Sequence, residues 1–297
     1  MGSESQLSMN LNPFLSFDAI YCISIAANRE RQQSCMNVAR DLGIPLQFHL
    51  VEKSPQGGTL GCFMSHVELV KKLYDGGLRN ALILEDDIVA SKGYSGDVMT
   101  QVARFIETDN EWEILQLGYS PMTHYYDVMC LWKLMNAKRI SSNIIQFMGL
   151  LTHAYCVSRK GMKRIVEESE KVVPYWGMGH ETPYGAKLVG VDSWYCQIFK
   201  DNKGVYATAP IQFDQKWCIP TDNRPTVLIE RILWRRFQCY AEKTKLFHYC
   251  SCLPLYHNVI IFLMVLTLAV VGMLVKRARK VHVVVGRVRG RRGGSAR

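Results

Sequence analysis

The sequence predicts an α/β domain followed by a C-terminal transmembrane helix. Short apolar runs rich in β-favouring residues alternate with segments of helical periodicity, which is the pattern of a sheet covered by helices. The chain has 297 residues, of which 48% are hydrophobic and 21% are charged, so it can bury the core of one large domain or two small ones. Between Lys245 and Lys276, thirty consecutive residues include no Asp, Glu, Lys or Arg, and this stretch predicts the transmembrane helix.

The N-terminal part is predicted to begin with a strand and a helix. Residues 18–25 are apolar and β-favouring, and Arg29 to Leu42 have helical spacing closed by Gly43. Because short, fully apolar strands that alternate with helices are typical of parallel sheets, we expect a parallel sheet covered on both faces. Further predicted strands are residues 46–51, 80–84, 113–118, 151–158 and 205–209, and further predicted helices are residues 65–74 and 160–169.

Two features refine this pattern. Ser65 and Glu68 have the spacing of a capping box, so the helix 65–74 is expected to begin at Ser65 and to end at the glycines that follow it. Residues 119–150 and 174–200 are less regular and contain Gly, Pro and aromatic residues, so we expect loops over a site there.

The last quarter of the chain divides into three segments. Residues 226–252 carry apolar residues at helical spacing among Lys and Arg, and we interpret them as an amphipathic juxtamembrane segment, with a last helix packed on the domain as the alternative. Residues 253–275 are long enough to cross the ~30 Å hydrocarbon core of a bilayer. Residues 276–297 form a basic tail rich in Gly and Arg.

These segments predict a membrane protein with a single-pass C-terminal anchor, and we expect no signal peptide at the N-terminus. Two rules disagree about the side on which the domain lies. Insertion by the tail leaves the domain in the cytosol, whereas nine Lys and Arg after the helix favour a cytosolic tail. The absence of an Asn-x-Ser/Thr sequence supports a cytosolic domain, and we adopt that reading.

The charge distribution argues against a nucleic-acid partner. Residues 1–225 contain 22 Lys and Arg and 24 Asp and Glu, whereas residues 226–297 contain 14 and 2. The excess basicity therefore belongs to the C-terminal quarter, where membrane lipids are the expected partner, and the globular part is slightly acidic.

An acidic triplet, Glu85-Asp86-Asp87, directly follows the apolar strand 80–84. In open α/β sheets, ligands bind outside the carboxyl ends of the strands, so a site is expected here. Three adjacent carboxylates repel one another unless water or a cation neutralises them, and their hard oxygens suit Mn²⁺ or Mg²⁺. Such an ion can bridge to a diphosphate, although a solvated acidic turn would show the same residues.

Four segments of the chain form an ordered set: Ile20–Ile25 followed by Arg29 and Arg31, Gly61-Cys-Phe-Met-Ser-His66, Ala81–Ile88 with the acidic triplet, and His153–Gly161. In this order they resemble glycosyltransferase family 25, the group that includes bacterial lipooligosaccharide galactosyltransferases and animal procollagen galactosyltransferases. The resemblance covers essentially the whole soluble part, and we identify residues 17–225 as a domain of this family.

The resemblance implies a GT-A-like, Rossmann-type single domain that transfers a hexose, galactose or glucose, from a UDP-sugar with inversion. The acceptor would be a hydroxyl of a glycan, a glycolipid or a glycoprotein, and Mn²⁺ or Mg²⁺ would assist. Glu85, Asp86 and Asp87 would bind the donor, with Glu85 and Asp87 as metal ligands. Arg31 would either contact the donor or pair with an acid. Asp192, a lone acid in an irregular region, is our candidate for the catalytic base or an acceptor contact, with a salt-bridge role as the alternative.

Other residues of the motifs have plainer expected roles. His66 is expected to orient a loop rather than to bind a metal ion. Tyr155, Trp176 and Trp194 would either stack on sugars or belong to the core.

One departure from the family pattern keeps a second hypothesis open. Ser24 stands where the first strand of the family usually carries Asn, which motivates the alternative of a non-catalytic membrane protein of the same fold that binds a nucleotide sugar or a protein. The intact acidic triplet favours an active enzyme. A third possibility, in which the basic tail acts as a lipid-binding scaffold, makes the domain incidental.

Overall fold

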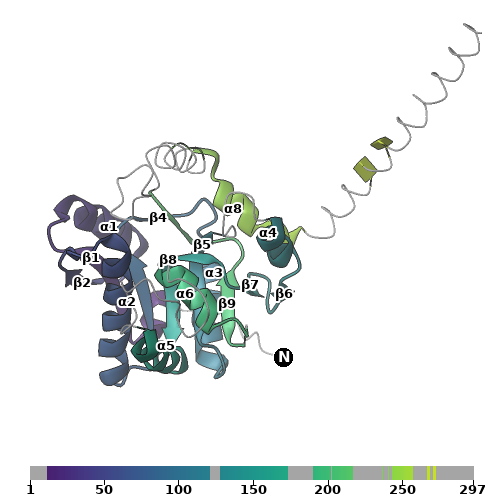
Figure 1. Ribbon diagram of the computed structural model, residues 1–297. Coiled ribbons are helices and arrows are strands. Elements are labelled where there is room, and N and C mark those ends of the chain that lie inside the picture. The colour runs from purple at the N-terminus through teal and green to yellow at the C-terminus, as the bar shows by residue number, and fades with distance from the viewer. Residues whose placement is uncertain are drawn as a thin grey trace, which may run out of the picture. The chain divides into compact units, whose positions relative to one another are not determined.

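The computed structural model describes residues 12–120, 128–172, 190–201, 203–216 and 243–256, and single positions at 236, 240, 266, 267, 270 and 271. The chain divides into two compact units, Met1–Pro254 and Leu255–Arg297. The first unit is an α/β domain in which helices lie on both sides of a central sheet (Figure 1).

The central sheet has eight strands in the order β2-β1-β3-β8-β5-β9-β7-β6. These strands are β1 (Ala19–Ile25), β2 (Gln47–Val51), β3 (Asn80–Glu85), β5 (Ile114–Ser120), β6 (Lys138–Arg139), β7 (Ile144–Gln146), β8 (Leu150–Ser158) and β9 (Val205–Thr208). Two short strands, β4 (Ile88–Ala90) and β10 (Phe213–Gln215), pair antiparallel as a separate ribbon.

The expectation of a wholly parallel sheet is wrong, because the sheet is mixed. β1 pairs parallel with β2 and β3, and β5 pairs parallel with β9, but β8 runs antiparallel to both β3 and β5. The apolar residues of β8 indicate that both of its faces are buried, but they do not indicate the direction of the strand. The sequence pattern therefore could not distinguish a parallel β8 from an antiparallel one.

Two hydrophobic clusters lie on the two faces of the sheet. Along β3, Leu82 and Leu84 belong to one cluster, and Ala81 and Ile83 belong to the other, as the alternation of a strand requires. The first cluster includes residues of α1 (Arg29–Leu42) and α3 (Gly96–Thr108), and the second includes residues of α2 (Gly58–Asp75), α5 (Arg159–Val172) and α6 (Val191–Ile198). Trp194 and Tyr155 are buried in the second cluster, so both are core residues, and Trp176 lies outside the described residues.

Most predicted elements are present near their expected bounds, but the start of the second helix is wrong. α2 begins at Gly58, seven residues before Ser65, and the Ser65 hydroxyl donates to the carbonyl of Gly61 at 2.6 Å. Ser65 is therefore an interior helical residue bonded to the preceding turn, a role that the same sequence spacing permits. The end of the helix before Gly76 is as expected.

The two regions predicted to be irregular contain regular elements. Residues 119–150 include α4 (Val128–Met135) and the hairpin of β6 and β7, and residues 174–200 include α6. α6 is only eight residues long, too short to be recognised from its periodicity.

The compact unit continues past residue 225 into α8 (Leu246–Ser251). A 3-10 turn, Leu253–Leu255, follows α8, and another 3-10 turn, Pro13–Ser16, is the first element in the described part of the domain. Ser251 is fully buried, and its hydroxyl accepts the amide of Ile211 at 3.0 Å. At Gly93, a Cβ atom would lie 2.7 Å from the His248 ring, so α8 packs closely on the domain. Residues 246–251 thus form a short helix on the domain, whereas the predicted amphipathic stretch 226–242 lies, apart from positions 236 and 240, outside the described residues.

The predicted transmembrane helix, 253–275, lies largely outside the described residues, and the tail 276–297 lies entirely outside them. Among the helices that the structure does describe, none has the length and apolar character that a membrane crossing requires.

Candidate active site

A cavity of about 340 Å³ opens at the carboxyl ends of the parallel strands β1, β2 and β3. Its volume lies within the ~300–1,000 Å³ range of small-molecule sites. Every residue predicted from the sequence to form the site lines it, namely Arg31, Glu85, Asp86, Asp87 and Asp192, and so does His66. The cavity thus lies beyond the carboxyl ends of these strands, where ligands bind in open α/β sheets.

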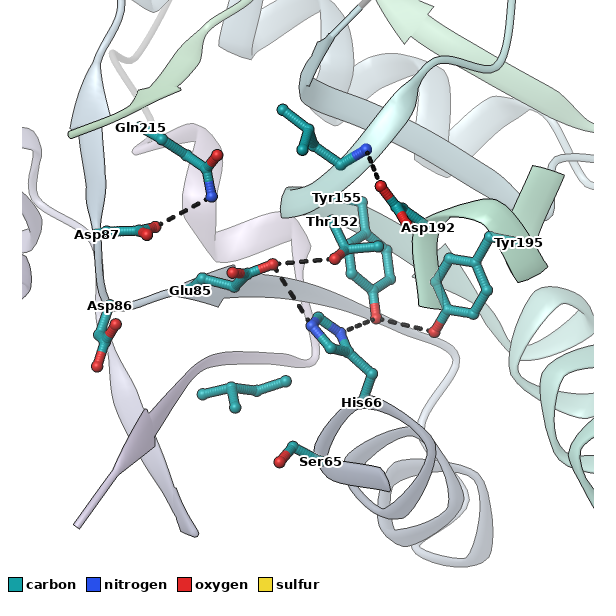
Figure 2. A network of polar contacts seen from close by, with 12 residues as sticks. Ser65, His66, Glu85, Asp86, Asp87, Thr152, Tyr155, Asp192, Tyr195 and Gln215 are labelled. Atoms are coloured by element: carbon teal, nitrogen blue, oxygen red, sulfur yellow. Dashed lines mark hydrogen bonds and ion pairs between the residues drawn. The ribbon is translucent and has the colours of Figure 1, made fainter. Parts of the chain in front are cut away.

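The acidic triplet is divided among three sets of partners. Glu85 is the last residue of β3, and Asp86 and Asp87 form the turn that leads into β4. In Figure 2 the carboxylate of Glu85 extends toward His66 and Thr152, that of Asp87 extends toward Gln215, and that of Asp86 is directed elsewhere. Three neighbouring acids therefore have three different environments.

Asp86 is anchored to the first strand and the first helix. Its carboxylate accepts the Ser24 hydroxyl at 2.6 Å and forms an ion pair with Arg31, and the residue is only 5% exposed. Burial raises the pKa of Asp86, and the nearby Arg31 guanidinium partly opposes that effect. Ser24, the departure from the family pattern, thus holds part of the acidic turn in place.

Asp87 is the acid whose ionisation is most disturbed. Arg31 lies 2.9 Å from its carboxylate, and the Gln215 side-chain amide donates to it at 3.3 Å. Burial, together with the negative charge of Glu85, raises the pKa of Asp87 to about 7. The backbone is also tied down, because the amide of Lys216 donates to the Asp87 carbonyl at 2.9 Å.

Glu85 belongs to a buried polar network that crosses the second cluster. Its carboxylate accepts the Thr152 hydroxyl at 2.9 Å and lies 3.5 Å from Nε2 of His66. The other ring nitrogen of His66 is 3.0 Å from the Tyr155 hydroxyl, which is 3.2 Å from that of Tyr195 (Figure 2). Burial alone would raise the pKa of Glu85, but His66 and Thr152 outweigh it and lower that pKa.

His66 is a buried residue at the centre of this network. The residue is 1% exposed and lies on α2, where it connects the end of β3 to Tyr155 of β8. The motif residues His66, Glu85 and Tyr155, far apart in the sequence, therefore meet in one contact set. His66 therefore contacts the Glu85 side chain, and its role in orienting a loop stays a prediction.

Asp192 lies in the first turn of α6, and in Figure 2 it is on the far side of Glu85 from Asp87. Its two carboxylate oxygens accept the backbone amides of Ser193, at 2.7 Å, and Leu151, at 3.2 Å. No ion pair of Asp192 is found among the described residues, so the salt-bridge alternative gains no support there.

No group of three or more His, Cys, Asp or Glu side chains in the described part of the chain is arranged to hold a metal ion. The chemistry at Asp87 nevertheless fits a divalent cation, because its hard oxygens carry charge that Arg31 offsets only in part and that a cation would stabilise. Glu85 is less available, since His66 and Thr152 engage its carboxylate.

Two residues of the site, Thr152 and Leu151, are absent from the predicted set. Both lie on β8 and line the cavity. They approach Glu85 and Asp192 only because β8 is inserted antiparallel beside β3. No local sequence signal marks such a contact.

Comparison with known proteins identifies the family. The sequence pattern of glycosyltransferase family 25, described as an LPS biosynthesis protein, matches residues 17–178. The chain belongs to glycosyltransferase family 25. Its membership confirms the resemblance and the expectation of an enzyme of the glycosyltransferase class. The curated proteins include no significant match to the chain.

Solved structures of distant sequence resemble this family 25 chain. The apo form of glycosyltransferase GlyE from Streptococcus pneumoniae TIGR4 has 12% identity and a TM-score of 0.37, over 63% of this chain and 44% of that one. A glycosyltransferase involved in glycosylation of the major capsid of PBCV-1 has 8% identity and a TM-score of 0.36, over 74% and 98%. A mutant of Drosophila β1,4-galactosyltransferase 7, in complex with manganese, UDP-Gal and xylobiose, has 9% identity and a TM-score of 0.38, over 72% and 78%. The present chain thus spans less than half the length of the GlyE chain.

Proposed function

We propose that this protein is an inverting glycosyltransferase that moves a hexose, galactose or glucose, from a UDP-sugar to a hydroxyl of a glycan, glycolipid or glycoprotein. The observation that carries the proposal is one cavity bordered by the acidic turn with Arg31 at one side and by Asp192 at the other. Such a site has a cationic and carboxylate-rich region for a diphosphate and a separate carboxylate for an acceptor hydroxyl.

On the donor side, Asp87 would hold Mn²⁺ or Mg²⁺, with Glu85 as a further predicted ligand. When bound, the ion neutralises charge on the departing diphosphate. Arg31 contributes a second positive charge close to the same place, and its ion pairs with Asp86 and Asp87 fix its orientation. Ser24 restrains Asp86 and thereby the turn that carries Asp87.

On the acceptor side, Asp192 acts as the general base. Its carboxylate takes the proton of the acceptor hydroxyl as that oxygen attacks the anomeric carbon. The bond from the anomeric carbon to the diphosphate oxygen breaks on the opposite face, and the diphosphate leaves with the electron pair. The amides of Leu151 and Ser193 hold the carboxylate in one orientation for this step.

The test measures UDP release by the purified full chain from a panel of UDP-hexoses, with and without Mn²⁺. One donor is expected to react in the presence of Mn²⁺, and Asp87→Asn and Asp192→Asn are each expected to lower kcat by at least ~10²-fold. Asp41→Asn is the matched control, because Asp41 lies on α1 with 74% of its side chain exposed. Absence of UDP release from every donor, by a folded protein that also fails to bind UDP, would reject the proposal in favour of a non-catalytic binding protein.

The proposal includes a membrane anchor formed by residues 253–275, which would present the domain to membrane-bound acceptors and place the basic tail against lipid. Its support is the uncharged stretch 246–275 and the basic residues after it. Replacing Leu266 and Val270 by Arg is expected to abolish carbonate-resistant membrane association, because each buried Arg costs about 2.5–3.5 kcal/mol. Unchanged association of this variant, alongside a Leu266→Phe control, would contradict the anchor. An epitope tag placed after residue 297 would test the predicted cytosolic side by protease protection.

A further inference from the structure

Leu151, at the start of β8, has a backbone conformation that a leucine seldom adopts. Its φ is +75°, and Lys245 is the one other non-glycine residue with positive φ in the described part of the chain. A bulky residue in this left-handed region is strained, and such residues persist only where the surrounding structure holds them. Leu151 also lines the cavity, so the strain is at the site.

The side chain of Gln116 holds the backbone around Leu151. Gln116 lies on β5, is 2% exposed, and donates its side-chain amide to the carbonyls of Gly149 at 3.0 Å and Leu151 at 3.1 Å. Its own side-chain carbonyl accepts the amide of Gly149 at 2.8 Å. A single buried amide thus bonds to the backbone on both sides of residue 150.

The strand pairing is irregular at the same place. The register of β5 against β8 shifts between Gln116 and Gly118 and again between Gly118 and Ser120. At Gly149, just before β8, a Cβ atom would lie 2.8 Å from the Ser120 carbonyl, so the backbone there approaches β5 more closely than another residue would allow. Irregularities of this kind redirect backbone groups next to active sites.

The group redirected here is the amide of Leu151, which donates to the Asp192 carboxylate at 3.2 Å. We propose that Gln116 and Leu151 are positioning residues for Asp192, because the Gln116 side chain keeps Leu151 in the left-handed conformation that aims this amide at the carboxylate. The inference rests on the proposed function of Asp192 as the base. Figure 2 shows the hydrogen bond that ends on Asp192.

The sharpest test compares two substitutions at residue 151. Leu151→Gly and Leu151→Val both keep the backbone amide, but glycine adopts positive φ readily and valine does not. We expect Leu151→Val to lower kcat for UDP release at least about 10-fold further than Leu151→Gly does, because small misplacements of a catalytic group cost this much or more. The dissociation constant for UDP with Mn²⁺ is expected to be unchanged in both.

A second variant tests the side-chain amide of Gln116 itself, and it keeps the inference testable if Leu151→Val does not fold. Gln116→Met keeps the size of the side chain, removes its hydrogen bonds, and is expected to lower kcat without weakening UDP binding. In the Leu151→Gly background the same change should have a smaller effect, since glycine needs less restraint to adopt the conformation. Gln33→Met, an exposed position on α1, is the matched control.

Equal kcat values for Leu151→Gly and Leu151→Val would overturn the inference, and so would a Gln116→Met variant that loses UDP binding as severely as kcat. A merely structural role would also show additive effects in the double variant. Asp192→Asn distinguishes a failure of the positioning inference from a failure of the proposed base. If it is inactive while Leu151→Val is fully active, only the positioning inference fails; if it is fully active, the proposed base fails as well.

Discussion

At the scale of single residues, the acidic turn shows how three adjacent carboxylates acquire different properties. Thr152 and His66 engage Glu85, Ser24 and Arg31 hold Asp86, and Gln215 and Arg31 contact Asp87. The pKa of Glu85 is lowered, whereas those of Asp86 and Asp87 are raised. The identity of the neighbouring groups therefore decides which acid is stabilised as a carboxylate.

The raised pKa of Asp87 predicts an unusual dependence of stability on pH in the metal-free protein. An Asp carboxyl in an unfolded chain has a pKa of about 3.9, and the folded value is about 7. Between these values the unfolded chain has released the proton that the folded chain retains, so this carboxyl destabilises the fold increasingly as the pH rises from ~4 to ~7. Denaturant unfolding should show Asp87→Asn gaining stability over wild type across that range, and a difference that is constant with pH would contradict the prediction.

The buried network around His66 makes a second prediction. Tyr155→Phe removes the hydroxyl that contacts both His66 and Tyr195 and leaves buried polar atoms without that partner. We expect a loss of about 1–3 kcal/mol in the free energy of unfolding. Tyr240→Phe, at a tyrosine that is 60% exposed, should change it by less than ~0.5 kcal/mol. Equal effects of the two substitutions in urea unfolding would argue against a structural role for the network.

At the scale of elements, the sequence allows good prediction where the signal is local. β1, α1 and the left-handed Gly43 that ends α1, with φ +69°, follow from an apolar run, helical spacing and a glycine. The direction of β8, the start of α2 and the existence of α6 do not follow, because they depend on contacts with distant segments. The site divides in the same way: Glu85, Asp86 and Asp87 are visible at a strand end, whereas the approach of Thr152, Leu151 and Gln116 requires the antiparallel insertion of β8.

One glycine of the family motif has a clear role at this scale. Gly161 lies in the first turn of α5, and a Cβ atom there would lie 2.1 Å from the carbonyl oxygen of Glu113, just before β5. Gly161→Ala is therefore expected to cost at least ~1–3 kcal/mol, because the helix must move away from the sheet. The matched control is Gly96→Ala at the start of α3, where no atom lies within 4 Å and the change should stay within about 0.5 kcal/mol. Thermal or urea unfolding of the two variants makes the comparison, and equal stability would contradict the close contact.

At the scale of the whole molecule, the compact unit that carries the site extends to Pro254 and includes α8. α8 is held to the rest of the unit, since Ser251 is buried and bonded to Ile211, and Lys92 donates to the Tyr249 hydroxyl at 2.7 Å. The segment just before the predicted anchor is thus part of the domain that carries out the proposed reaction.

A pair of truncations tests this boundary. A chain of residues 1–225 lacks α8 and leaves the buried amide of Ile211 without its partner, a loss of about 1–3 kcal/mol. Its Tm is therefore expected to be lower than that of residues 1–254 by roughly 2 °C or more. Indistinguishable melting curves would show that α8 contributes nothing to the stability of the domain.

The central claim is that the cavity binds a nucleoside diphosphate through a cation held at Asp87. Titration calorimetry of UDP into the full chain, with and without Mn²⁺, tests it most directly, because binding requires neither the correct sugar nor the acceptor. UDP is expected to bind with Mn²⁺, and its affinity is expected to fall at least ~10-fold, about 1.4 kcal/mol, when Mn²⁺ is omitted or Asp87 is replaced by Asn. UDP affinity that is the same in all three cases would contradict it.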